Sequence, residues 1–222
     1  MALAASAWIA GGDVAHAQLF GTDVVNVASV SYNVGSETET VATNRAVFTI
    51  RPAATPAVIE FFRNSPTAPA PIFRSINGSD FSPSGDLAGD FISIGDPVTT
   101  GGDLVNLNSE IPLIPATTYL AGELMFIRVT DTGQNFNSDA IDTVNITVTS
   151  DTGDVIVLRL YESDPNSGEF WAYVPSTLAA SVQNDNELSV GSNSQLTATY
   201  VDTFDSTDVT VDTAIVLSLI HI

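Results

Sequence analysis

The chain contains no cysteine and no lysine, and its 26 acidic residues stand against only 6 basic ones, all of them arginine. Without cysteine there is no disulfide, no thiol nucleophile and no zinc site of the usual cysteine-containing kind. The net charge of -20 leaves few cations to displace the counterions of phosphates, so nucleic acid and anionic membrane surfaces are poor partners. Because 44% of the residues are hydrophobic, the acidity indicates solubility or attraction of divalent cations rather than disorder.

The N-terminus has the pattern of a secretory signal peptide over residues 1–17. Residues 2–10 form a short apolar run, and Ala15-His16-Ala17 is an A-x-A cleavage site before Gln18. The run is too short to cross a membrane. A basic segment ahead of it is missing, so the natural start is expected to lie upstream. The alternative is an ordinary N-terminal extension. We expect an exported protein, extracellular or on a bacterial outer surface, with no direct membrane insertion.

Period-two runs rich in Val, Ile, Thr, Tyr and Phe recur between clusters of Gly, Asp, Asn and Pro, whereas helical periodicity is nearly absent. This pattern is typical of an all-β chain. Six such runs between 124 and 216 predict an antiparallel Ig-like β-sandwich with additional N-terminal strands. We divide the chain into a partial β repeat segment (18–52), a loop-rich β segment (53–118) and the sandwich (119–216). Whether 53–118 is an independent domain or adds strands to the sandwich stays open.

Two resemblances add to this prediction. The motifs VTDTGQNFNSDAIDTVNITVTS, LYESDPNSGEF and LSVGSNSQLTATYVD resemble an Ig-like module of very large, repeat-containing bacterial cell-surface proteins. VNVASVSY and TNRAVFTI, within 24–50, are similar to the end of a conserved repeat domain in the same proteins. The resemblance implies an extracellular protein built from repeats, whose neighbouring β-sandwich modules in the same chain would be its first partners.

The last residues, LSLIHI (217–222), resemble the in-frame translation of a transposon-end sequencing adapter. The alternative is a genuine terminal strand. We expect an artefactual tail, with the native chain continuing beyond Val216. His16 and His221 are then both foreign to the mature protein, so a Ser or Thr nucleophile has no imidazole or amine base beside it. Carboxylate pairs are too numerous here to indicate a glycosidase. We therefore expect no enzyme.

The loops that follow three predicted strands are rich in the oxygen ligands that calcium prefers. If strand direction alternates, loops 131–140, 162–169 and 202–208 gather at one end of the sandwich. The candidate metal ligands are Asp131, Asn135, Asp139, Glu162, Asp164, Asp202, Asp205 and Asp208. Without a cation these carboxylates would repel one another, so calcium would also stiffen the loops. The alternative is that Asp and Asn only form solvated turns. No EF-hand loop is present.

Trp171 and Tyr173 lie in EFWAYVPS, where Phe170, Ala172 and Val174 fit the core face. Alternation then turns the two rings to the opposite face, where the resembled family usually has small or apolar residues. One reading is an exposed platform that stacks on sugar rings. The other is burial beneath segment 57–118 or a neighbouring module.

These observations favour a non-catalytic structural and interaction module of a large bacterial surface protein. The module would be a rigid, acidic and calcium-stiffened spacer, adhesin-like, whose external partners are surface glycans or proteins. The alternative is a carbohydrate-binding module that uses Trp171 and Tyr173. A hydrolase whose catalytic domain lies further along the natural chain is a third reading.

Overall fold

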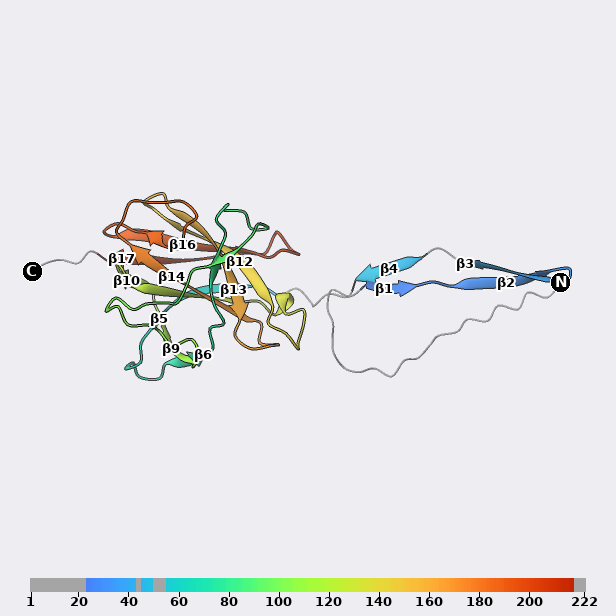
Figure 1. The fold of residues 1–222 in the computed structure, drawn as a ribbon, viewed down its shortest axis with the longest axis horizontal. Helices are drawn as coiled ribbons and strands as arrows, with labels where there is room; N and C mark the ends of the chain where they lie inside the picture. The colour runs from blue at the N-terminus through green and yellow to red at the C-terminus, as the bar shows by residue number, and fades with distance from the viewer. Residues whose placement is uncertain (1–22, 43–44, 50–54, 218–222) are drawn as a thin grey trace, which may run out of the picture.

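The computed structural model describes residues 23–42, 45–49 and 55–217, and its regular structure is almost entirely β-strand (Figure 1). The all-β prediction is confirmed. The strands are β1 (Asp23–Asn26), β2 (Ser29–Val34), β3 (Glu37–Ala42), β4 (Ala46–Thr49), β5 (Val58–Asn64), β6 (Ile72–Arg74), β7 (Asp80–Phe81), β8 (Ile92–Ser93), β9 (Ile111–Pro115), β10 (Thr118–Leu120), β11 (Leu124–Thr130), β12 (Thr143–Ser150), β13 (Val155–Glu162), β14 (Glu169–Thr177), β15 (Leu188–Ser189), β16 (Ser194–Val201) and β17 (Val209–Leu217). One 3-10 turn, η1 (Thr132–Gln134), follows β11. Within these ranges no helix is long and apolar enough to cross a membrane.

Residues 23–42 and 45–49 form two separate two-stranded antiparallel ribbons, one of β2 with β3 and one of β1 with β4. Gly35, at φ +67°, makes the reversal between β2 and β3, a backbone conformation that glycine adopts without a steric penalty. Ser31 and Thr40 face each other across the ribbon with their hydroxyls 2.8 Å apart. The predicted signal peptide at 1–17 lies outside the described residues.

Residues 55–217 form a β-sandwich from one continuous sheet that folds over on itself. One layer contains β10, β17, β16, β12 and β13, and the other contains β14, β11, β5, β9 and β6. The layers join where β13 ends, because β13 pairs with β14 only through Tyr161–Trp171 and Glu162–Phe170. β11 and β12 are consecutive but do not pair, so the chain crosses between the layers rather than forming hairpin after hairpin.

The expectation of a purely antiparallel sandwich needs one correction. β10 pairs with β17 in parallel through Thr118–Ile215, Tyr119–Val216 and Leu120–Leu217. β14 also pairs in parallel with β15. Parallel neighbours cannot be joined by a tight turn; residues 178–187 separate β14 from β15, and the strands β11 to β16 lie between β10 and β17 in the chain. Leu217, the first residue of the predicted artefactual tail, is the last residue of β17, and 218–222 lie outside the described residues.

The main core fills the space between the two layers. β12 alternates buried and more exposed residues along its whole length, with Val144, Ile146 and Val148 turned inward. The opposite layer contributes Phe170, Ala172 and Val174, as their predicted core-face position requires. Burial of such apolar side chains is the main source of stability.

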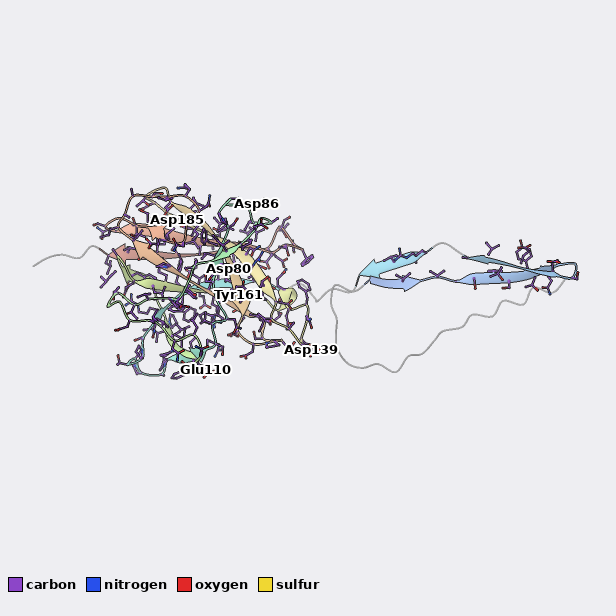
Figure 2. The ribbon with its side chains drawn as sticks, in the orientation of Figure 1. Asp80, Asp86, Glu110, Asp139, Tyr161 and Asp185 are labelled. Atoms are coloured by element: carbon purple, nitrogen blue, oxygen red, sulfur yellow. The ribbon has the colours of Figure 1, made fainter. Side chains whose placement is uncertain are left out.

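A second core covers the other face of the β14–β11–β5 layer. It consists of Phe62, Ile76, Ile111, Leu113, Leu124, Phe126, Trp171 and Tyr173. Segment 58–118 supplies half of these residues, and its strands also join the sheet, since β5 pairs with β11 and β7 with β13. Tyr161 donates a 2.5 Å hydrogen bond to Asp80 at the second of these junctions, where the two residues lie side by side (Figure 2). Segment 58–118 therefore adds strands and a cover to the sandwich.

Candidate functional site

Several predicted metal ligands meet at one end of the sandwich, which we call the acidic end: Asp131, Glu162, Asp202 and Asp208. Asp131 follows β11, and Asp202 and Asp208 flank the reversal between β16 and β17. The Asp202 N–H donates to the Asp208 carbonyl at 3.0 Å. Glu162 ends β13 at the same end, where it pairs with Phe170 near the start of β14. Strand direction alternates as the sequence indicated, and this alternation brings the four residues together.

Asp131 is 1% exposed, and both of its carboxylate oxygens are occupied. Oδ1 accepts a hydrogen bond from the Gly133 N–H at 2.8 Å, and Oδ2 accepts one from the Tyr200 hydroxyl at 2.8 Å. Burial raises the pKa of Asp131, the charges of Asp202 and Asp208 raise it further, and the two hydrogen bonds oppose them. Asp131 therefore anchors η1 against β16.

Asp202 is also buried, and its Oδ1 holds two loops at once. It accepts hydrogen bonds from the Gln134 carboxamide Nε2 at 2.7 Å and from the Phe204 N–H at 2.6 Å. The Asp205 N–H adds a third contact at 3.2 Å. The other end of the carboxamide, Gln134 Oε1, accepts from the Thr203 hydroxyl at 3.2 Å. The side chains of Asp202 and Thr203 thus hold the nitrogen and the oxygen of the buried Gln134 carboxamide, respectively.

Glu162 is linked to Asp131 through the backbone of Gly168. The Gly168 N–H donates to Glu162 Oε1 at 2.7 Å, and the Gly168 carbonyl accepts from the Asp131 N–H at 2.9 Å. Gly168 has φ +62°, and a Cβ built on it would lie 3.2 Å from Thr132. A larger residue there would be strained and crowded.

The remaining predicted ligands do not join this group. Asp139 and Asp164 are exposed, and Asp139 projects from the surface of the body (Figure 2). Asn135 donates from Nδ2 to Asn166 Oδ1 at 2.9 Å. Asp205 accepts from the Thr207 N–H and, with Asp208, lines a shallow hollow of about 330 Å³. In the part of the chain that the structure describes, no group of three or more Asp, Glu, His or Cys side chains could hold a metal ion.

Sequence reasoning missed three residues of the acidic end: Gln134, Tyr200 and Gly168. One signal was available, because Asp131-Thr132-Gly133 is a short polar turn in which an Asp side chain accepts from the backbone two residues on. That pattern indicates a carboxylate already engaged by its own loop. The contacts of Gln134 and Tyr200 bridge 68 and 69 residues of sequence, and no local pattern reveals them.

Of the two readings for Trp171 and Tyr173, the structure bears out burial beneath segment 57–118 and contradicts the exposed platform. Trp171 is 0% and Tyr173 2% exposed, and both belong to the second core. The Trp171 ring lies 4.9 Å from that of Phe62, and the Tyr173 hydroxyl donates to the Gly95 carbonyl at 2.6 Å. The rings do face away from the main core, as alternation predicted, but segment 58–118 covers them. Neither ring is available to a sugar.

A cluster of ion pairs lies beside these rings. Arg128 pairs with Glu60 and, at 3.6 Å, with Glu169, which Arg74 also contacts at 2.7 Å. The Arg128 guanidinium lies 4.9 Å from the centre of the Phe62 ring and 5.6 Å from that of Trp171. Burial alone would raise the pKa of Glu169, but the hydrogen bond and charge of Arg74, with the charge of Arg128, hold that pKa below its usual range. The Arg128 guanidinium therefore lies against two rings of the second core, those of Phe62 and Trp171.

No protein-family model matches the sequence, and no curated protein matches it either.

Proposed function

We propose that this chain is a non-catalytic, load-bearing structural module of an exported bacterial surface protein. The observation that carries the proposal is the course of the first and last strands of the body. β5 begins at the acidic end, beside Thr130 of β11. β17 also begins at the acidic end and finishes at the opposite end, where Leu217 pairs with Leu120. The two strands run side by side in the same direction, so tension on the chain pulls them apart lengthwise.

Lengthwise tension loads many hydrogen bonds at once. β17 pairs with β16 along its whole length and with β10 near its end. Between β5 and β17, two aspartates accept backbone hydrogen bonds in place of a regular ladder: Asp208, directly before β17, and Asp212, within it. Asp208 Oδ2 accepts from the Ala57 N–H at 3.0 Å, and Asp212 Oδ2 accepts from the Phe61 N–H at 3.2 Å. Bonds that must break together raise the unfolding barrier, which governs resistance to forced unfolding.

The acidic end supports the same proposal. Its buried carboxylates are used to hold loops to strands, through Tyr200, Gln134 and Gly168. A polar network with its partners in place makes a structure rigid. Rigidity of this kind suits a spacer and does not require calcium, whose binding at this end stays a prediction.

Single-molecule pulling tests the load-bearing role in the full-length chain. Because the chain has no cysteine, Thr55→Cys with Leu217→Cys gives unique handles at opposite ends of the body. Thr55→Cys with Ser206→Cys places both handles at the acidic end, where bonds break one after another. We expect a distinctly higher unfolding force for the first pair. Equal forces would contradict the proposal.

We call the contacts of Asp208 and Asp212 with the backbone of Ala57 and Phe61 the aspartate seam. This seam provides a matched pair of variants for the pulling experiment. Asp212→Ala removes the acceptor of the Phe61 N–H and should lower the force measured between positions 55 and 217. Thr213→Ala changes the next residue, which is exposed, and should leave the force unchanged. Loss of force in both variants, or in neither, would show that the seam has no particular role.

The exported location and the partners are tested separately. The acidic, lysine-free surface and the predicted signal peptide support an extracellular place, with neighbouring β-sandwich modules as first partners and surface glycans or proteins as external ones. Fractionation of cells that express the chain with its predicted signal peptide, preceded by the upstream segment expected in the natural gene, should find it outside the cytoplasm and accessible to added protease. Retention in the cytoplasm would contradict the location.

A further inference from the structure

The outer faces of the two layers of the sandwich are covered differently. Segment 58–118 lies over the β14–β11–β5 layer and buries Trp171 and Tyr173. In the opposite layer, the residues of β10, β17, β16 and β12 that point away from the main core stay exposed or half-buried. We call this set the uncharged face: Thr118 and Leu120, with every second residue from Thr143 to Thr149, from Gln195 to Val201 and from Val209 to Leu217.

No residue of the uncharged face carries a charge, although the chain has a net charge of -20. Its side chains are mostly Thr, Val, Ile and Leu, and its valines are between 39% and 53% exposed. Thr199 lies near its centre, opposite Thr147 of β12 on one side and Val211 of β17 on the other. Asn145 donates to the Leu87 carbonyl at 2.7 Å, so the loop after β7 limits the face beyond β12. A contiguous exposed surface of this kind marks an interaction site in a soluble protein.

Charge decides which partner this face suits. Two copies of an acidic chain repel one another, and like charges buried against each other cost several kcal/mol. The uncharged face presents no charge to be buried, so it is the surface on which two copies approach at least cost. An anionic polymer finds no cation on it, and a sugar finds no aromatic ring on which to stack.

The size of the face fits a weak dimer. A strand residue covers about 16 Å² of sheet, given about 3.3 Å along the strand and about 4.8 Å between strands. The four strands therefore present roughly 450 Å². Two copies would bury about 1,000 Å² once the relief of the side chains is included, which is the lower limit for a specific interface. Sheets that pack face to face lie about 10 Å apart, and β-branched side chains suit such a pleated surface.

We propose that a second copy of this chain docks on the uncharged face, sheet on sheet, around a two-fold axis near Thr199. The contact is isologous, so each copy uses the same residues. Threonine hydroxyls keep the face hydrated in the monomer, and the methyl groups of Thr, Val and Ile supply the apolar area that dimerisation buries. This inference holds whether or not the module bears load, because docking uses outward side chains and not the bonds between β5 and β17.

Sedimentation equilibrium of the full chain tests the proposal. Concentrations from about 10 μM to about 1 mM are needed, because so small an interface gives weak binding. We expect a monomer–dimer equilibrium whose Kd falls several-fold between about 0.15 M and about 1 M NaCl, since the Debye length shrinks from about 8 Å to about 3 Å and screens the repulsion between two acidic bodies. A chain that stays monomeric at every concentration and salt, or a dimer that salt weakens, would overturn the proposal.

Charge variants locate the contact. Thr199→Glu sets two like charges against each other near the axis and should raise the Kd about ten-fold or more, whereas Thr199→Gln, of equal size, should raise it much less. Val211→Glu repeats the test at a more exposed position of the face, and circular dichroism checks that each variant is folded. Thr100→Glu, in an exposed loop of segment 58–118, and Val41→Glu, in the ribbon of β2 and β3, add the same charge elsewhere and should leave the Kd nearly unchanged. A Kd that both face variants leave unchanged, or that Val41→Glu raises as strongly, would assign the contact to another surface and overturn the proposal.

Discussion

Carboxylates are accommodated in two different ways at two places in this sandwich. Beside the second core, Glu169 and Glu60 share Arg128, and Arg74 adds a second cation to Glu169. At the acidic end, Asp131 and Asp202 are buried with hydrogen-bond donors only, and none of the ion pairs between described residues reaches them. A chain with only 6 cations thus supports one set of carboxylates by charge and the other by neutral donors.

The difference has an energetic consequence. A cation stabilises the ionised form of a carboxylate, whereas burial and neighbouring acids disfavour that form. The pKa of Glu169 is accordingly lowered and that of Asp131 raised. The acidic end therefore opposes folding slightly when fully ionised, and the cluster around Arg128 supports folding only while ionised.

The largest effect is expected from Arg128→Ala. The substitution leaves Glu60 and Glu169 with fewer cations and removes the guanidinium from the Phe62 and Trp171 rings. We expect a loss of roughly 2 kcal/mol, less than for a fully buried pair because both glutamates are partly exposed. Urea unfolding at neutral pH measures it. Val211→Ala, an exposed site on β17, serves as the control and should change stability by less than about 0.5 kcal/mol. Equal losses would show that the Arg128 cluster contributes nothing beyond an ordinary surface.

A smaller effect, of opposite sign at the two places, is expected from pH. Because the pKa of Glu169 is lowered on folding, its contribution is present above the usual pKa and is lost as pH falls through the folded value. Because the pKa of Asp131 is raised, its contribution is full below the usual value of 3.8 and is lost as pH rises through the folded value.

Two conservative variants resolve these contributions in urea unfolding between about pH 3 and about pH 7. Glu169→Gln should weaken the loss of stability in acid. Asp131→Asn should gain stability relative to the wild type as pH rises, because it removes a buried charge. Asp139→Asn, at an exposed position, should leave the dependence of stability on pH unchanged, both in acid and near neutral pH. Variant curves parallel to the wild-type curve would remove the distinction between the two places.

The fold class followed from the sequence because alternation is a local signal. In β12, TVNITVTS, the inward positions are Val144, Ile146 and Val148, followed by Ser150, and the strand buries one face. In β14, EFWAYVPST, apolar residues occupy both faces, and the strand is buried on both. A continuous apolar run is typical of a strand covered on both sides. Alternation alone placed Trp171 correctly with respect to the main core but could not reveal the cover.

The cover and the pairing order depend on contacts that are distant in sequence. β5 pairs with β11 across a long stretch of sequence: the paired residues Glu60 and Arg128 are 68 residues apart. The parallel pairing of β10 with β17 joins Thr118 to Ile215. Both segments are short or irregular, and period-two patterns carry no information about which edge a strand joins. The acidic end was easier to predict, because chain reversal alone gathers alternate loops. Its hydrogen-bond donors were not predictable from loop composition.

The smallest effect concerns calcium at the acidic end. The buried carboxylates already have hydrogen-bond partners, so an ion would have to bind at the rim, where Asp205 and Asp208 line the hollow. Calcium at a concentration equal to its Kd stabilises a one-site protein by about 0.4 kcal/mol, which a thermal melt detects as a small rise in Tm. Asp205→Asn should reduce that rise, and magnesium should produce less of it because it gives up its water reluctantly. A Tm that excess calcium leaves unmoved would mean that the acidic end is held by hydrogen bonds alone.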